Sequence, residues 1–465
     1  MKLLLVRPAR MKQAITLGEF MFSEPIGLEI IYNILKADHD IEILDLMIDP
    51  VERFEELVIE WEPEVVGFTT LCVDVPGALS LAKQAKSLNS NIVTMVGGTQ
   101  AYLAPEAFFV PEIDHVFQYT NTINLETLFT LLSSNEPIPI IDGIRSRIHD
   151  YRYSGNKGRN ECLQPDRAST ARYRKHYNYF GYKPAAIMQT SLGCSKACHF
   201  CLRWRMEGGR ENDLPMDMII QQIMDIQEPT IMIYDNDFLN NGSRLNEFCE
   251  QLEQHNIKKN FICYGSVHGI LTNRDAVKRF AQNGLRATLV GYETFKDEEL
   301  SDYHKKSSST DNVEASKLLK EYGIDCWASF IFHPDWTKAD FKSFRSYMRK
   351  LKPEICTFSP LTPFPNLPLY EEYKDRLLVD KTSYHLWSFS QMVIRPGKMS
   401  IRQYLFQMLV SSLYINFVNN NFSYLVKKFS VATVYRIILG SGKIAVSMIG
   451  MIVKGEKHYQ MQASE

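Results

Sequence analysis

Two series of short apolar runs, each alternating with helical segments, constrain the fold of this 465-residue chain more than any other feature. The first series has five predicted strands, which are KLLLV, IEILDL, EVVGFTTL, NIVTMVGG and DHVFQY. Amphipathic segments such as GLEIIYNILKA lie between them. Strands that alternate with helices indicate βαβ units and a parallel sheet. Residues 1–145 are therefore predicted to form a doubly wound α/β domain.

The carboxyl ends of these strands carry the candidate ligand-binding residues of the first domain. If the strand order is flavodoxin-like, a ligand lies over that edge of the sheet. Arg7, Thr70, Asp74, Gly97 and Gly98 follow three of the predicted strands closely. The alternative is that they are ordinary loop and turn residues.

A second alternating series predicts a different parallel fold. A polar segment, predicted as a linker over residues 146–184, precedes six strands near AAIMQTS, TIMIYDN, NFICYGS, RATLVGYE, CWASFIF and ICTFSPL. Six βα repeats over residues 185–370 predict a partial (β/α)6 barrel, with its chemistry at the carboxyl ends of the strands. Residues 371–465 are predicted to be mainly helical.

Composition excludes some classes of function. Lys and Arg total 52 and Asp and Glu total 54, so no basic field would attract nucleic acid. The start, MKLLLVRPAR, lacks the pattern of a secretory signal, and we expect a cytoplasmic location. The apolar stretch from Ile444 to Val453 is shorter than a membrane span, which predicts a buried or interfacial helix and allows peripheral contact with a membrane surface.

Three of the nine cysteines lie close together in SLGCSKACHFCLRW, directly after the first predicted barrel strand. Cys194, Cys198 and Cys201 have the spacing C-x3-C-x2-C. Thiolates are soft ligands that suit zinc or an iron-sulfur cluster. A structural zinc site normally has a fourth ligand, whereas a [4Fe-4S] cluster with three ligands leaves one iron open. Iron-sulfur, zinc and buried structural thiols all stay open at this point, with iron-sulfur favoured.

The triplet resembles the signature of the radical S-adenosylmethionine (SAM) superfamily. Further segments match that family in order: IMIYDNDF, AVKRFAQNGLRATLVGYETFKDEEL, DNVEASKLLKEYGIDCWASFIF and LTPFPNLPLY. The resemblance implies that the three cysteines hold a [4Fe-4S] cluster whose open iron binds SAM. It also implies that Gly291 and Glu293 lie near SAM, and that Asp235 and Asp237 reach SAM or the substrate. For both aspartates the alternative is a helix cap in a solvated loop, and for Glu293 it is a structural ion pair.

The first domain resembles that of the cobalamin-binding class of this superfamily, which includes anaerobic magnesium-protoporphyrin cyclases and hopanoid methylases. The likeness rests on SEPIGLEIIYNILKA, IEILDL, EVVGFTT and MVGGTQA. It implies that Arg7, Thr70, Asp74, Gly97 and Gly98 line a corrin ring. The motif Asp-x-His-x-x-Gly, whose His ligates cobalt in many cobalamin enzymes, is absent from the sequence.

The resemblance predicts a cobalamin-dependent methyltransferase that methylates an unactivated carbon of a small or apolar metabolite. It implies an external electron donor, a flavodoxin or ferredoxin. One alternative is radical cyclisation, oxidation or rearrangement without methyl transfer. Another is a redox-sensing iron-sulfur protein, which would not need a barrel with SAM-like segments. The methylthiotransferase family is disfavoured because only one cysteine, Cys72, precedes the predicted linker.

Overall fold

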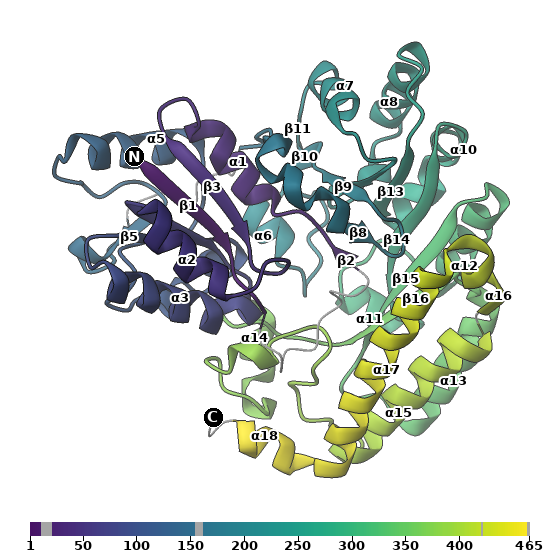
Figure 1. Cartoon of the computed structure of the whole chain (residues 1–465). Helices are drawn as coiled ribbons and strands as arrows, with labels where there is room; N and C mark the ends of the chain where they lie inside the picture. The colour runs from purple at the N-terminus through teal and green to yellow at the C-terminus, as the bar shows by residue number, and fades with distance from the viewer. Residues whose placement is uncertain (11–20, 154–160, 420–421, 463–465) are drawn as a thin grey trace. The chain divides into compact units, whose positions relative to one another are not determined.

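The computed structural model describes residues 1–10, 21–153, 161–419 and 422–462 (Figure 1). Its chain forms two compact units. The first contains the N-terminal strand, residues Glu24–His176 and the short segment Lys381–Ser388. The second contains Tyr177–Asp380 and the C-terminal region from Phe389 onward.

The first unit is a doubly wound α/β domain, as predicted. Its sheet has the order β3-β1-β4-β5-β6-β7. All of these strands except β7 run parallel to one another. The five parallel strands therefore follow the flavodoxin-like order 2-1-3-4-5. The strands are β1 (Lys2–Arg7), β3 (Asp40–Asp45), β4 (Val65–Thr69), β5 (Val93–Gly97), β6 (His115–Phe117) and the antiparallel β7 (Ile144–Ser146).

Helices cover both faces of this sheet because alternate strand side chains point to opposite faces. On one face, α1 and α5 enclose an apolar cluster that includes Leu3, Leu5 and Leu128. On the other, α2 and α3 enclose a cluster that includes Leu4, Val6 and Phe54. The helices are α1 (Ile26–Leu35), α2 (Glu52–Trp61), α3 (Val75–Leu88), α4 (Thr99–Leu103) and α5 (Thr122–Ser134).

Part of the predicted linker packs against the first unit. Residues 154–160 lie outside the described residues, but Arg167–His176 forms 3-10 helical turns against α1 and β3. Arg167 and Arg174 both form ion pairs with the buried Glu24 carboxylate. The first unit therefore extends to His176, and the domain limits drawn from the sequence remain predictions.

The second unit contains the partial barrel. Its six strands are parallel and stand in chain order, with β9 and β16 at the two edges. They are β9 (Ala185–Met188), β12 (Thr230–Ile233), β13 (Asn260–Gly265), β14 (Leu285–Glu293), β15 (Asp325–Phe332) and β16 (Ile355–Pro360). The connecting helices are α7 (Met216–Asp225), α8 (Gly242–Gln254), α9 (Val267–Thr272), α10 (Arg274–Gln282), α11 (Asp297–Asp302), α12 (Ser309–Glu321) and α13 (Lys338–Leu351).

The C-terminal region is helical, as predicted, and completes the second unit. It contains α15 (Ile401–Leu413), α16 (Phe422–Lys428), α17 (Val431–Lys454) and α18 (Glu456–Gln462). The buried Tyr404 of α15 donates its hydroxyl to the carbonyl oxygen of Phe332, at 3.0 Å, which anchors the helix to the end of β15. The apolar stretch expected at Ile444–Val453 is only the last part of α17, which has 24 residues.

Candidate active site

The three cysteines lie on the loop that follows β9 and the short strand β10 (Ser191–Leu192), at the carboxyl edge of the barrel. β10 pairs antiparallel with β11 (Asn212–Asp213), which closes the loop. Gly193 has φ +92°, and a Cβ there would stand 2.0 Å from the carbonyl oxygen of Arg210. Only glycine fits this turn, so Gly193 determines how the chain enters the cysteine loop.

Hydrogen bonds from the following helix, α6 (Arg203–Glu207), hold the loop. The Trp204 indole donates to the carbonyl oxygen of Cys198 at 2.9 Å, and the Arg205 guanidinium donates to that of Cys201 at 2.9 Å. The Cys194 N–H donates to the carbonyl oxygen of Gly208 at 3.1 Å. These contacts satisfy loop backbone groups without using the thiols.

The three thiols fit a cluster by their chemistry and their exposure. Cys194, Cys198 and Cys201 are free and partly exposed, whereas the four cysteines on the barrel's strands and helices are buried: Cys249, Cys263, Cys326 and Cys356. Among the described residues, no three His, Cys, Asp or Glu side chains converge on one metal ion. A [4Fe-4S] cluster does not need that convergence, because each thiolate binds a different iron.

Burial and neighbouring charges shift the pKa of two thiols in the loop. Burial raises the pKa of Cys194 to about 11. Burial also raises the pKa of Cys198, although the positive charge of Lys305 opposes this effect. Because a cluster takes thiolates, metal binding must release these protons and is coupled to the positive charges nearby.

One lysine within the cysteine loop, Lys196, and one beside it, Lys305, were not identified from the sequence. Lys196 forms an ion pair with Asp237 and donates to the side-chain oxygens of Asn240, at 2.9 Å, and Ser266, at 2.6 Å. Lys305 forms an ion pair with Glu293, with 2.9 Å between Nζ and Oε1. The position of Lys196 within the cysteine triplet could have identified it from the sequence. No sequence pattern marks Lys305, because it approaches the loop only in the folded chain.

The predicted SAM-contacting residues lie at the ends of β12 and β14. Glu293 has φ +62°, an unusual conformation for a residue with a side chain, and its carboxylate folds over Gly291. A Cβ at Gly291 would stand 2.4 Å from Oε1 of Glu293. The sequence Gly-x-Glu therefore shapes this strand end as a unit, and the contact of both residues with SAM stays a prediction.

Asp235 and Asp237 have different surroundings. The buried Asp235 carboxylate accepts the Thr190 N–H at 2.7 Å, the Ser191 hydroxyl at 2.9 Å and the Thr190 hydroxyl. Burial raises the pKa of Asp235. Asp237 accepts the Ser266 N–H at 2.8 Å in addition to its ion pair with Lys196. Both carboxylates thus join neighbouring strand ends, and neither contact tests the prediction that they reach SAM or substrate.

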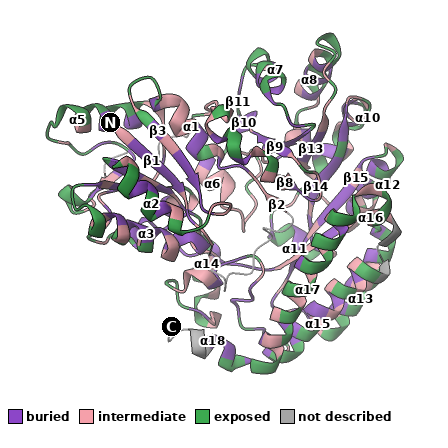
Figure 2. Cartoon of the chain, viewed as in Figure 1, coloured by how far each residue is buried: buried purple, intermediate pink, exposed green. Residues whose placement is uncertain are grey.

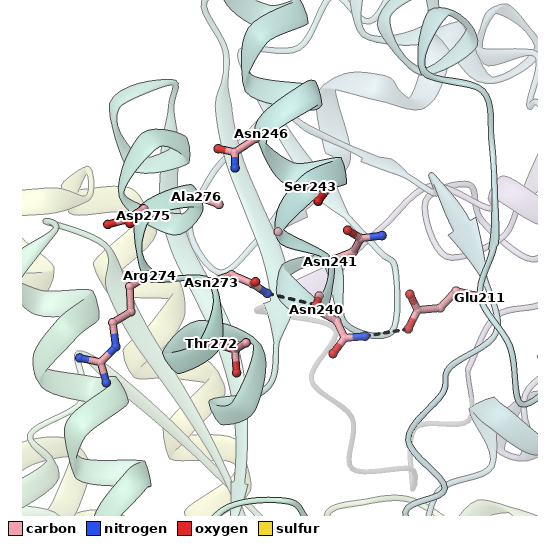
Figure 3. A pocket seen from close by; sticks show the side chains of 11 residues that line it. Glu211, Asn240, Asn241, Ser243, Asn246, Thr272, Asn273, Arg274, Asp275 and Ala276 are labelled. Carbon is pink, nitrogen blue, oxygen red and sulfur yellow. Dashed lines mark hydrogen bonds between the residues drawn. The ribbon is translucent and has the colours of Figure 1, made fainter.

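Two hollows lie near the loop. The smaller is beside Cys198 and is lined by Lys196, Ser266, Val267, His268, His304 and Lys305, among others. The larger, shown in Figure 3, is a polar pocket between the first turns of α8 and α10. Asn240 in its wall donates to Glu211 at 3.1 Å, and Glu211 also accepts from Ser195 at 3.2 Å. This pocket thus shares its wall with the network that supports the cysteine loop.

The carboxyl edge of the first unit brings three of the predicted cobalamin-contacting residues together. The Thr70 N–H and hydroxyl both donate to the carbonyl oxygen of Gly97, each at 2.9 Å, which joins the ends of β4 and β5. Gly98 has φ +97°, and a Cβ there would stand 2.8 Å from the carbonyl oxygen of Thr70. Glycine at position 98 therefore lets the chain pack directly against the Thr70 backbone at this edge.

Arg7 and Asp74 lie at ends of the same sheet but already have partners. Arg7 forms an ion pair with Asp45, at 3.5 Å, at the ends of β1 and β3. Asp74 pairs with Arg10 at 3.6 Å and accepts the Leu71 N–H at 3.0 Å. Burial raises the pKa of Asp74. Their contact with a corrin stays a prediction.

Comparison with known proteins identifies both units. Residues 21–128 match the family model of the B12 binding domain, and residues 188–348 match that of the radical SAM superfamily. The chain is a radical SAM enzyme of the cobalamin-binding class. The cofactors predicted from the sequence, a [4Fe-4S] cluster, SAM and cobalamin, are those of these two domains.

Similar proteins share most of the chain. Hopanoid C-3 methylase of Methylococcus capsulatus is 26% identical over 390 residues, covering 83% of this chain and 75% of its own. Anaerobic magnesium-protoporphyrin IX monomethyl ester cyclase of Rubrivivax gelatinosus is 22% identical over 407 residues, covering 82% and 71%. The structure of the radical SAM methyltransferase TsrM from Kitasatospora setae, with cobalamin and a [4Fe-4S] cluster bound, has a TM-score of 0.63 at 16% identity, covering 80% and 78%.

Proposed function

We propose that this enzyme is a cobalamin-dependent methyltransferase that methylates an unactivated carbon of a small or apolar metabolite. The observation that carries the proposal is the pairing of two sites on one chain. One is the three-thiol loop at the barrel edge, and the other is a B12-binding domain that carries Gly97 and Gly98 at the carboxyl end of β5. The similarity to a hopanoid methylase supports methyl transfer to an apolar carbon skeleton.

The chain's own residues have separable roles in this proposal. When bound, the cluster supplies an electron for cleavage of SAM, and cobalamin supplies a transferable methyl group. Cys194, Cys198 and Cys201 would each hold one iron of the cluster. Lys305 neutralises Glu293 beside the loop, so that a SAM molecule meets an ion pair and not an isolated negative charge. Gly291 leaves the space that the Glu293 carboxylate occupies, because a Cβ there would stand 2.4 Å from its Oε1.

A second candidate function is radical cyclisation or rearrangement without methyl transfer. Its support is the similarity to the magnesium-protoporphyrin cyclase, which extends over 82% of this chain. For either function we propose that a flavodoxin or ferredoxin delivers the electron, and that the enzyme works in the cytoplasm.

The test uses full-length protein purified anaerobically and reconstituted with iron and sulfide. Under reductant, we expect SAM cleavage that depends on Cys198, so a Cys198→Ala variant should lose it. A Cys249→Ala variant is the matched control, because that thiol is buried away from the loop and should not matter. Zinc in place of iron, or normal cleavage by the Cys198→Ala variant, would refute both candidate functions.

Cobalamin distinguishes the two candidates. Protein loaded with hydroxocobalamin should form S-adenosylhomocysteine from SAM under reductant, because cobalamin must be remethylated by SAM before each transfer. Protein without cobalt should not form it. Equal S-adenosylhomocysteine formation with and without cobalt, or none in either case, would contradict methyl transfer through cobalamin and favour the second candidate.

A further inference from the structure

The outward face of α17 carries exposed apolar side chains toward both ends of the helix, with Ser441, Gly442 and Lys443 between the two groups. Figure 2 shows exposed residues along this helix, although the opposite face packs on α15 through buried residues that include Val434, Met448 and Met451. The exposed apolar side chains are Val431, Tyr435, Ile438, Leu439, Val446, Ile449 and Val453. Val431, Val446 and Val453 are 82%, 69% and 69% exposed. Soluble surfaces rarely carry an apolar row of this length without a partner.

The spacing of these residues places them on one stripe. At 3.6 residues per turn all seven fall within one face of the helix, although seven positions separate Leu439 from Val446. Arg436, Lys443 and Lys454 all fall on one flank of the stripe when the helix is drawn at 3.6 residues per turn. An apolar stripe bordered by basic side chains is typical of helices that lie in a membrane interface.

The C-terminal region that contains α17 also carries an excess of basic residues. Residues 389–465 contain nine Lys and Arg but only two Asp and Glu, a net charge of +7. The whole chain has a net charge of −2, so the other residues together carry −9. Anionic lipid headgroups attract basic residues near their surface and repel acidic ones. The positive net charge of the C-terminal region therefore favours its contact with an anionic membrane.

We propose that α17 docks the enzyme on the surface of an anionic phospholipid bilayer, lying in the interface plane. Among the described residues, α17 is the single helix that is long and apolar enough to cross a membrane, judged by length and composition alone. Spanning is disfavoured because Lys443 lies near the middle of the helix, where a charge is costly in hydrocarbon. Spanning would also separate α17 from α15, which the Arg402 bond to the Val453 carbonyl oxygen, at 3.0 Å, helps to hold.

The test measures sedimentation of the full chain with vesicles, and it does not depend on turnover. We expect binding to vesicles of phosphatidylcholine with about a third phosphatidylglycerol, weak binding to phosphatidylcholine alone, and release at high salt. A Val446→Glu variant should bind at least about tenfold more weakly, because it places a carboxylate in the exposed stripe that would enter the lipid interface. Ile123→Glu is the matched control, since Ile123 is 70% exposed on α5 of the first unit.

Several outcomes would overturn the proposal. One is equal vesicle binding by the Val446→Glu variant and the wild-type chain. Another is failure of the wild-type chain to bind anionic vesicles. A third is a wild-type dimer that Val446→Glu converts to a monomer without any vesicle binding, which would make the stripe an interface between two copies. Circular dichroism of the variant should match the wild type, since Val446 is already exposed and its replacement removes no core contact.

Discussion

The ion pair between Lys305 and Glu293 permits a quantitative test of the active-site geometry. Replacement of Lys305 by Met keeps most of the aliphatic chain but leaves the Glu293 carboxylate without its partner. Both side chains are largely buried, with 12% and 10% of their surfaces exposed. Burial by itself lowers the pKa of Lys305, but Glu293 and Cys198 raise it above its ordinary value overall. Lys305 is therefore charged in the folded protein.

Breaking a buried ion pair by removing one partner costs about 3–5 kcal/mol. For a unit of this size each kcal/mol lowers the unfolding midpoint by about 2–4 °C. We therefore expect the Lys305→Met variant to lose on the order of 10 °C in the melting of the metal-free protein, followed by circular dichroism. The double variant Lys305→Met with Glu293→Gln should recover most of that loss, because no charge remains buried.

The control is an exposed ion pair of the same kind. Lys374 and Glu371 pair at 3.2 Å, but their side chains are 56% and 69% exposed. Exposed pairs contribute about 0–1 kcal/mol, so Lys374→Met should shift the midpoint by about 4 °C or less. A Lys305→Met midpoint within 2 °C of the wild type, or no recovery in the double variant, would show that the pair does not stabilise the site as argued.

Three further predictions test other parts of the molecule. Gly193→Ala should lose most of its cluster iron, measured by iron content and visible absorbance, whereas Gly209→Ala, which meets no atom within 4 Å, should keep it. Gly98→Ala should weaken cobalamin binding, measured by absorbance titration, because its Cβ would meet the Thr70 carbonyl oxygen at 2.8 Å. Gly27→Ala, whose Cβ would meet no atom within 4 Å, should bind cobalamin normally. Burial raises the pKa of Glu29 to about 8 from its ordinary 4.5, so the folded chain holds a proton there that the unfolded chain releases. The contribution of Glu29 to stability thus falls as pH rises from about 5 to 8. The difference in thermal unfolding midpoint between the wild type and Glu29→Gln should therefore change by about 2 °C or more across that range. A difference that stays constant with pH would contradict the raised pKa of Glu29.

Periodicity predicted most of the fold because it is a local signal. The five parallel strands of the first unit and the six of the barrel occur where the alternating apolar runs placed them. The length of α17 was underestimated, because Arg436 and Lys443 interrupt the apolar run although both are compatible with a helix that exposes one face.

The sequence by itself determined the parallel architecture, the cysteine loop after β9 and the glycines at the strand ends, since each depends on neighbours within a few residues. Only the tertiary structure decided which charges meet. Lys305 reaches Glu293, 12 residues away, and Asp235 is bound by Thr190 and Ser191 from another strand end. Such partners depend on the convergence of strand ends in space, which no local pattern of residues encodes.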